Sequence, residues 1–492
     1  MNRKEFKNLA KNYNVIPVYE IITADLLTPV SAYLKIRRKN EFSFLLESVE
    51  GIGRLARYSF IGHSPTKTII SDKSNITVKH KNSEEKISGN ILDFLSSEIN
   101  TFNHPIVNDL PDFTGGLVGY LGFEVISEIE NSIIFTNKKD DNFPKAIFGF
   151  FDSIIAFDHY KHRIILITNA VINNSSNLDF LYDKAKAKIK ELKLLLQQTT
   201  ELPEKFTLTG KTQDKIEEDN FSKKIEKIKN NIYEGDVFQL VLSERFSSQY
   251  SGDLLNVYRA LRIINPSPYM YIFEFDNDLS IIGTSPEDLL KVKEKKATIL
   301  PIAGTRRRGH TDEEDIALEK DLLNDEKEIA EHTMLVDLAR NDLGRVCKFN
   351  SVKVTEKMNI HRFSHVMHIV SKVEGELKED KNCIDALKAS FPAGTVSGAP
   401  KIRAIQLIEE YEEISRGPYA GSVGYIDFNG NLDMCIAIRT LFADKKNIYW
   451  QAGAGIVADS KAKLELKEIK NKAAVLESAL KFAEVIDENL GD

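Results

Sequence analysis

The sequence predicts a large mixed α/β protein, because its two halves carry different hydrophobic patterns. The chain has 492 residues, 42% of them hydrophobic, which is enough to bury a large core. Residues 1–175 alternate short apolar runs with polar turns, a pattern typical of strands with few long helices. Residues 179–198 place their apolar side chains on one helical face and so predict a helix.

The polar stretch after this helix contains helix-breaking residues and indicates a linker that ends near residue 220. We therefore expect an N-terminal region over 1–175, a helix and linker over 176–219, and a separate folded unit over 220–485.

In the second half strands alternate with helices, as expected of a mixed protein. We expect a strand over 296–305 that breaks at Gly304, one long charged helix over about 312–339, and a closing amphipathic helix over 463–486. Three arginines follow Gly304. We expect Arg306 to face a site, and Arg307 and Arg308 to pair with the acidic segment downstream.

Composition excludes several classes of protein. The 66 basic residues against 73 acidic ones give a net charge of -7, which argues against a nucleic-acid binder. The three cysteines lack metal-binding or disulfide spacing, which favours a reducing compartment. The N-terminus has no apolar signal region, and no run of 18 apolar residues occurs, so we expect a cytoplasmic protein with no membrane partner.

Two pairs of glutamates recur at helical spacing. Glu328 and Glu331 lie three residues apart, as do Glu465 and Glu468, and Lys472 lies one turn beyond Glu468. Two facing carboxylate pairs suit Mg2+, which prefers oxygen ligands and commonly bridges to an anionic substrate. The alternative is a pair of solvated helix faces that carry ordinary charge pairs.

Three histidines cluster in "HRFSHVMHIVSKVEG", at positions 361, 365 and 368. The second half of this segment reads as a strand, so His365 and His368 point to opposite faces and do not easily share a metal. One of them on a pocket-facing strand is suited to general acid or base catalysis. A structural role is the alternative for each.

Two glycine-rich turns offer backbone N–H groups to an anion. The segment "FPAGTVSGAPK" lacks the spacing of a phosphate loop, but it enters a helix N-terminus, which favours a carboxylate. The segment "QAGAGIVADS" is similar and precedes the Glu465/Glu468 helix. Together with Arg439 these turns are suited to hold two carboxylates, unless the glycines serve backbone conformation alone.

Several long motifs, in this order, resemble those of chorismate-utilising enzymes: "PIAGTRRRG", "DEKEIAEHTMLVDLARNDLGRV", "FPAGTVSGAPKIRAIQLIEE", "RGPYAGSVGYID" and "QAGAGIVADSKAKLELKEIKNKAA". They cover most of residues 220–480. The N-terminal segments "TPVSAYLKI" and "FLLESVEG" are similar to the large, chorismate-binding subunits of anthranilate synthases. The resemblance implies an α+β fold with a large antiparallel β-sheet sandwich core flanked by helices, and residues 220–485 as the catalytic domain.

The resemblance also implies a chemistry, in which chorismate and ammonia give anthranilate and pyruvate. It implies Mg2+ at Glu331 and Glu468, with Glu328 and Glu465 beside them, and His368 as the acid for the departing ring hydroxyl. The remaining positions that match pocket residues are Glu287, Ala303, Gly304, Thr305, Thr395, Tyr419, Arg439, Gly453, Ala454, Gly455 and Lys472.

Two residues favour amination over the reactions of related enzymes. Relatives that add water carry a lysine base where this chain has Gln239, and a neutral amide cannot deprotonate water. Para-aminating relatives, the aminodeoxychorismate synthases, often have a nucleophilic lysine where this chain has Ala303. That para-aminating activity is the alternative, and a catalytically inactive tryptophan-sensing or scaffolding subunit is the alternative outside enzymes.

The resemblance implies feedback inhibition by tryptophan. The implied inhibitor site comprises Glu47, Ser48, Pro268, Tyr269 and Met270, with strand packing as the alternative. None of the three cysteines has the setting of a glutaminase nucleophile. We therefore expect a hetero-oligomer in which a separate glutamine amidotransferase subunit supplies ammonia.

Overall fold

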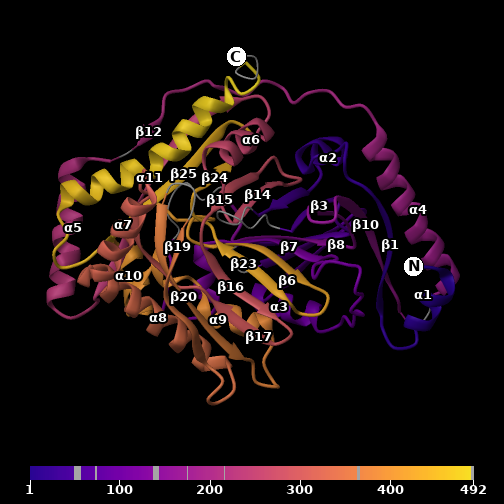
Figure 1. Cartoon of the computed structure of the whole chain (residues 1–492), viewed down its shortest axis with the longest axis horizontal. Helices are drawn as coiled ribbons and strands as arrows, with labels where there is room; N and C mark the ends of the chain where they lie inside the picture. The colour runs from indigo at the N-terminus through magenta and orange to yellow at the C-terminus, as the bar shows by residue number, and fades with distance from the viewer. Residues whose placement is uncertain are drawn as a thin grey trace.

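Two large antiparallel sheets lie at the centre of the molecule, with helices around them (Figure 1). The computed structural model describes residues 1–48, 57–72, 75–136, 143–173, 176–214, 216–362 and 366–488. Aromatic side chains of the two sheets pack against each other. The ring centres of Phe44 and Phe151 are 4.7 Å apart, and those of Phe60 and Tyr425 are 6.2 Å apart. The expected sandwich of antiparallel sheets flanked by helices is thereby confirmed.

The first sheet has 13 strands. Its main path runs, in spatial order, through β1 (Val15–Thr23), β10 (Arg163–Val171), β9 (Ser153–Asp158), β3 (Tyr58–His63), β2 (Ser43–Glu47), β14 (Tyr269–Glu274), β15 (Ser280–Ser285), β24 (Thr440–Ala443), β25 (Asn447–Ile456), β13 (Gln239–Ser251) and β11 (Thr207–Leu208). Two short strands, β12 (Gln213–Asp214) and β21 (Gly398–Ala399), also pair with β13.

The second sheet has 12 strands. Its path runs through β18 (Ile302–Arg307), β20 (Val366–Glu376), β17 (Lys296–Ile299), β16 (Asp288–Lys293), β23 (Leu432–Ile436), β22 (Ser422–Asp427), β7 (Gly116–Leu121), β8 (Ala146–Phe151), β4 (Lys67–Asp72), β5 (Asn75–His80) and β6 (Ser83–Ser88). One further strand, β19 (Lys353–Arg362), pairs with β20.

The helices surround these sheets. They are α1 (Arg3–Leu9), α2 (Pro29–Ile36), α3 (Ile91–Ile99), α4 (Leu178–Gln197), α5 (Glu218–Tyr233), α6 (Leu255–Ile264), α7 (Asp312–Asn324), α8 (Glu326–Val346), α9 (Cys383–Ser390), α10 (Lys401–Tyr411) and α11 (Ala462–Ala483), with the 3-10 turns η1 (Phe123–Glu128) and η2 (Gly394–Val396). Helices α1 and α4 lie on the right of Figure 1, whereas α5, α7, α8, α10 and α11 lie on the left.

Both sheets contain strands from each side of the expected linker. In the first sheet Glu47 of β2 pairs with Met270 of β14, and in the second sheet Gly119 of β7 pairs with Gly424 of β22. One hydrophobic core runs from Phe6 to Ile486. The expectation that the second half is a separate unit is therefore wrong. The limits 1–175, 176–219 and 220–485 stay a prediction about organisation along the chain.

Two other expectations about elements are corrected. The strand expected over 296–305 is two strands, because Pro301 has no N–H to donate to a ladder, and β18 continues past Gly304 to Arg307. The single long helix expected over 312–339 is divided between α7 and α8. Asp325 is extended at this point, and its carboxylate accepts hydrogen bonds from the first backbone N–H groups of α8.

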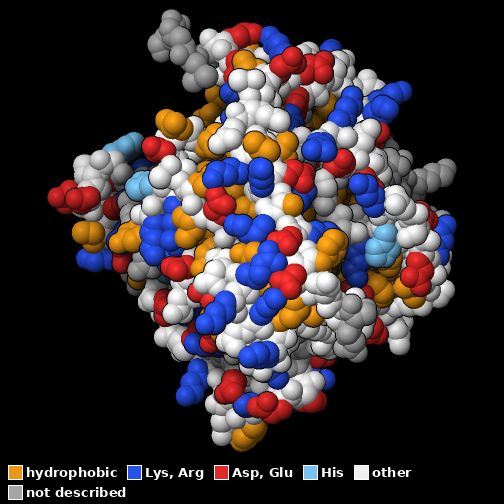
Figure 2. All heavy atoms as spheres, turned by 90° about the vertical axis from the view of Figure 1, so that its right-hand side faces the viewer, with side chains coloured by type: hydrophobic (Ala, Val, Ile, Leu, Met, Phe, Trp, Pro, Cys, Tyr) orange, Lys and Arg blue, Asp and Glu red, His pale blue; other side chains and the backbone are white. Residues whose placement is uncertain are grey.

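The face that α4 covers mixes basic and acidic side chains (Figure 2). Ion pairs join Lys193 to Glu20 and Lys188 to Glu191 there. Over the described residues this face is therefore not a continuous basic surface.

Candidate active site

His368 is held by the neighbouring strand β18. Thr305 pairs with His368 across the β18–β20 ladder, and Gly304 forms a bulge beside it. The His368 Nδ1–H donates to the carbonyl oxygen of Gly304 at 2.9 Å, and the Thr305 hydroxyl lies 3.0 Å from the same nitrogen. Any proton exchange with a ligand would therefore go through Nε2. Burial lowers the pKa of His368, and the positive charge of Arg439 acts in the same direction.

The other two histidines of the cluster are placed differently. His361 lies opposite His368 on the exposed strand β19. His365 lies outside the described residues. His368 is therefore partly buried whereas His361 is exposed, and the catalytic role of His368 stays a prediction.

The start of α8 places two carboxyl groups beside β18. A Cβ added to Gly304 would lie 3.3 Å from Oε2 of Glu328, so these two residues are neighbours. Arg306 leaves the strand toward the helix and lies 3.5 Å from Glu328 and 2.8 Å from Asp325. Arg307 and Arg308 pair with Glu314 and Asp315, as expected.

Glu331 lies one turn further along α8 in a field of negative charge. Its pKa is raised first by burial and then by the carboxylates of Glu328, on the same helix, and Glu468, on α11. The fold therefore brings the two predicted glutamate pairs together. Glu465, half-buried, lies one turn before Glu468 on α11.

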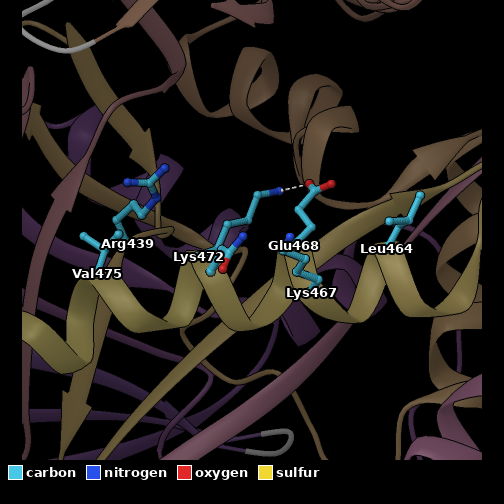
Figure 3. Close-up of a pocket in the computed structure, with 7 residues that line it drawn as sticks. Arg439, Leu464, Lys467, Glu468, Lys472 and Val475 are labelled. Atoms are coloured by element: carbon cyan, nitrogen blue, oxygen red, sulfur yellow. Dashed lines mark ion pairs between the residues drawn. The ribbon is translucent and has the colours of Figure 1, made fainter. Parts of the chain in front are cut away.

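Helix α11 forms one wall of an open pocket (Figure 3). The pocket has a volume of about 460 Å³ and is lined by Arg439, Leu464, Lys467, Glu468, Asn471, Lys472 and Val475. The Lys472 ammonium lies 2.7 Å from Oε1 of Glu468 and donates to the carbonyl oxygen of Gly453 at 3.0 Å. Lys472 therefore ties the helix to strand β25.

Arg439 points into this pocket from the segment before β24 (Figure 3). Its backbone is in the left-handed region, at φ 51°. Burial lowers the pKa of its guanidinium, and no carboxylate among the described residues pairs with it. A buried cation without a protein counter-ion is suited to bind an anionic ligand.

Glu287 and Thr395 lie side by side near Lys472. Burial raises the pKa of Glu287 to about 7, and the hydroxyl of Thr395 and the charge of Lys472 act against this rise. Both residues line a small cavity beneath the helix α8 residues Leu335 and Leu338. The Glu287 carboxyl can therefore hold or release a proton near neutral pH.

The glycines of β25 let two polar side chains approach the strand. A Cβ at Gly455 would lie 2.5 Å from Nε2 of Gln239, and a Cβ at Gly453 would lie 2.9 Å from the Tyr419 hydroxyl. Burial raises the pKa of Tyr419 to about 12, so the phenol stays a hydrogen-bond donor at neutral pH. Ala454, between the two glycines, is buried.

Ala303 lies at the bulge of β18, beside Gly304, and is buried. The predicted substrate-contacting residues thus come from β18, η2, β25 and the segments before β22 and β24. Sequence reasoning missed Lys467 and Asn471, which share the pocket-facing side of α11 with Glu468 and Lys472. Asn471 follows Glu468 by three residues, a helical spacing that could have found it, and Lys467 lies four residues before Asn471.

The glutamates of α8 and α11 supply some, but not all, of the ligands that a divalent cation needs. Among the residues that the structure describes, no group of three or more histidine, cysteine or acidic side chains is arranged as a complete metal site. Burial and then the carboxylates of Glu328 and Glu468 raise the pKa of Glu331, whereas Lys327 and Lys472 lower it, so these acidic groups lie close to one another. Two carboxylates suffice for Mg2+ when waters and substrate oxygens supply the other ligands.

The predicted inhibitor residues gather at the junction of β2 and β14. Glu47 pairs in register with Met270, and its carboxylate accepts a hydrogen bond from the Tyr258 hydroxyl at 2.6 Å and lies 3.1 Å from Nε of Arg262. Tyr269, beside Pro268, donates from its hydroxyl to Asp433 at 2.9 Å. Ser48 follows β2 directly. The inhibitory role of these residues stays a prediction.

None of the described helices combines the length and the hydrophobicity needed to cross a membrane.

Comparisons with known proteins cover nearly the whole chain. The model of a family described as chorismate binding enzyme matches residues 43–478. Anthranilate synthase component 1 of Acetivibrio thermocellus is 44% identical over 488 residues, which span 97% of this chain and 98% of that protein. The protein of the same name from Aquifex aeolicus is 44% identical over 496 residues, 98% of each chain.

Two solved structures have folds similar to that of this chain. Anthranilate synthase component I from Streptococcus pneumoniae TIGR4 superposes with a TM-score of 0.74 at 37% identity, covering 92% of this chain and 98% of that one. The menaquinone-specific isochorismate synthase of Escherichia coli superposes with a TM-score of 0.71 over 97% of this chain and 99% of that one. At 19% identity, this second likeness shows the fold alone.

Proposed function

The chain belongs to the family of chorismate binding enzymes, and from this we propose that it is component 1 of an anthranilate synthase, a lyase of tryptophan biosynthesis. It converts chorismate and ammonia to anthranilate, pyruvate and water. The observation that carries the proposal is 44% identity, over the whole length, to proteins named anthranilate synthase component 1. The gathering of the predicted pocket residues from both ends of the catalytic segment supports it.

The charges of the pocket are suited to chorismate, which is a dianion. The Arg439 guanidinium and the Lys472 ammonium offer positive charge on one wall. The backbone of Gly453 and Gly455, the Tyr419 phenol and the Thr395 hydroxyl offer uncharged hydrogen-bonding groups beside them. Binding of both carboxylates would hold the ring between β18 and β25.

His368 is the side chain that would protonate the departing ring hydroxyl. Ammonia adds to the ring, the C–O bond of the ring hydroxyl breaks, and the proton from Nε2 goes to that oxygen, which leaves as water. The proton that the new ammonium group then releases restores the protonated imidazole. Loss of the enolpyruvyl group as pyruvate, together with a ring proton, then gives the aromatic amine. Glu287, with its pKa of about 7, is placed to exchange a proton during these steps.

The carboxylates of Glu331 and Glu468, with Glu328 and Glu465 beside them, would hold Mg2+. The metal, when bound, supplies positive charge that stabilises a substrate carboxylate and draws electron density from the breaking bond.

Gln239 and Ala303 support amination over hydration. The Gln239 amide lies against Gly455 and cannot deprotonate water. Ammonia needs no such base, because it is already a nucleophile. Ala303 provides no nucleophile for a covalent intermediate, which favours ortho amination over the para-aminating alternative.

A glutamine amidotransferase subunit would supply ammonia in the cell, and tryptophan would inhibit the enzyme at the Glu47–Met270 junction. The name component 1 of the relatives supports a second component. The three cysteines are all free thiols, which supports work in the reducing cytoplasm.

The test is to incubate the purified chain with chorismate, Mg2+ and an ammonium salt, and to identify the product. Anthranilate supports the proposal. A para-aminated product supports the aminodeoxychorismate alternative, and absence of any product supports an inactive sensing or scaffolding subunit. Glutamine in place of ammonium is expected to give no product until the partner subunit is added.

A further inference from the structure

Arg416 lies in the segment between α10 and β22 and is 1% exposed. All three nitrogens of its guanidinium donate hydrogen bonds. Nε and Nη2 donate to the two oxygens of Glu412 at 2.8 and 2.6 Å, Nη1 donates to the carbonyl of Val396 at 2.7 Å, and Nη2 also donates to the carbonyl of Val241 at 2.8 Å. A buried cation with four such bonds fixes its partners firmly.

The partners of Arg416 belong to the segments that carry the candidate substrate-contacting groups. Val396 follows Thr395 directly in the turn η2. Val241 pairs with Gly455 across the β13–β25 ladder. The guanidinium therefore ties the Thr395 turn to the glycine strand.

Glu412 extends the same network along β13. Its Oε1 accepts hydrogen bonds from the backbone N–H and the hydroxyl of Ser243, at 2.8 and 2.7 Å. Ser243 pairs with Gly453, and its hydroxyl accepts a hydrogen bond from Gln451 at 2.8 Å. The ion pair of Arg416 and Glu412 thus reaches both ends of the segment 453–455.

The guanidinium also lies over two aromatic rings. Its central carbon lies 4.5 Å from the ring centre of Phe123 and 5.6 Å from that of Tyr419, whose hydroxyl approaches Gly453. The backbone N–H groups of Arg416 and Gly417 donate to the buried carboxylate of Glu124, in the N-terminal half. The position of the Tyr419 ring therefore depends on the same network.

We infer that Arg416 is a positioning residue of this enzyme: its guanidinium fixes the Thr395 turn, the Gly453–Gly455 strand and the Tyr419 ring in the arrangement that binds the anionic groups of the substrate. This inference rests on the proposed function for the identity of that substrate. A buried ion pair adds little to stability compared with apolar packing of the same volume, whereas it specifies one arrangement of the groups around it. Arg416 itself is not a catalytic residue, because it acts through its partners.

The test compares Arg416→Lys and Arg416→Met with wild-type enzyme by steady-state kinetics with chorismate and ammonium. Lysine keeps the charge but cannot serve all four acceptors, because an ammonium has no fork geometry. We expect the KM for chorismate to rise about tenfold in both variants while kcat changes by less than about threefold, as for loss of substrate binding. Melting followed by circular dichroism reports stability in parallel.

Arg37→Met is the matched control. Arg37 is also largely buried, with 14% of its side chain exposed, and it pairs with Glu274 at 3.0 Å and with Asp253, neither of which belongs to the candidate site. This variant should lose thermal stability with a KM within about twofold of wild type. If an Arg416 variant does not fold, Glu412→Gln, which keeps the shape of the partner, takes its place in the kinetic comparison and should raise KM in the same direction.

An unchanged KM in folded Arg416 or Glu412 variants overturns the inference, and so does an equal rise in KM for Arg37→Met. Failure of the proposed function gives a different result, because wild-type enzyme would then make no anthranilate. The dissociation constant of chorismate, measured by calorimetry on the same variants, tests the inference in that case as well.

Discussion

At the scale of single residues, burial and neighbouring charges set the protonation of the side chains in the candidate site. Burial lowers the pKa of His368 and raises those of Glu287 and Tyr419, to about 7 and about 12. In the ligand-free protein at neutral pH the imidazole is therefore mostly uncharged and the phenol protonated. A dianionic substrate would raise the pKa of His368 again, so substrate binding and acid catalysis are coupled.

His368→Gln should lower kcat by about 10²- to 10³-fold, because the amide cannot donate the proton that the leaving oxygen needs. Its melting temperature should stay near that of wild type, since the carbonyl of Gly304 can still accept a hydrogen bond from the amide. The measurement is anthranilate fluorescence with saturating chorismate. His361→Gln, on the exposed strand β19, is the control and should keep full activity. Equal activity of the two variants would exclude His368 as the acid.

The pH dependence of the rate should show the coupling directly. If the protonated imidazole is the proposed acid, kcat/KM should fall as the pH rises through the pKa of His368 in the free enzyme, which lies below its ordinary value. The fall of kcat should occur at higher pH, because the bound dianion raises that pKa. Profiles of kcat and kcat/KM from pH 5 to 9 test this prediction. A fall of both constants at the same pH would contradict it.

At the scale of elements, the bulge in β18 connects the acid to the carboxylates of α8. Gly304 has a φ of 70°, in the left-handed region, and its carbonyl accepts the hydrogen bond from His368. A Cβ there would lie 3.0 Å from Leu322 and 3.3 Å from Glu328. The bulge therefore sets the distance between the strand and the start of α8.

Gly304→Ala should destabilise the protein by about 1–3 kcal/mol, because alanine is strained at a positive φ. It should also lower kcat, since it displaces both His368 and Glu328. Denaturant unfolding and product assays provide the two measurements. Gly344→Ala, in the last turn of α8 with open space at its Cβ, is the control and should be neutral or stabilising by up to about 1 kcal/mol. A stable and fully active Gly304→Ala enzyme would show that the bulge is dispensable.

At the scale of the whole molecule, the two halves of the chain form one body. Each sheet takes strands from both halves, and Glu124 of the N-terminal half holds the backbone of the Arg416 segment. The residues of the candidate site therefore depend on strands that lie far away in the sequence. The predicted inhibitor site lies at one such junction, where β2 meets β14.

Residues 220–485 expressed alone should not fold, because β14 and β22 would each lose a neighbouring strand and expose apolar edges. Circular dichroism and size-exclusion chromatography test this. A monomeric fragment with a cooperative melting transition would show instead that the second half is independent.

Ser48→Phe should abolish inhibition by tryptophan while the rate without tryptophan stays within about twofold of wild type. The larger ring would occupy the space after β2 where the inhibitor is expected to bind. Rates measured over rising tryptophan concentration test this prediction. Unchanged inhibition would exclude the β2–β14 junction as the inhibitor site.

The sequence by itself determined the class of fold and most elements, and it predicted the residues of the candidate site, because hydrophobic periodicity and local motifs are properties of neighbouring residues. Its errors have local causes too: Pro301 divides one expected strand, and Asp325 divides one expected helix.

Only the tertiary structure decided which distant residues meet. It brings Glu331 of α8 into the field of Glu468 of α11, gives His368 its carbonyl partner, and makes Arg416 the common partner of three site segments. It also joins the two halves into shared sheets. These contacts depend on strand order and long-range packing, which no pattern within one segment of the chain specifies.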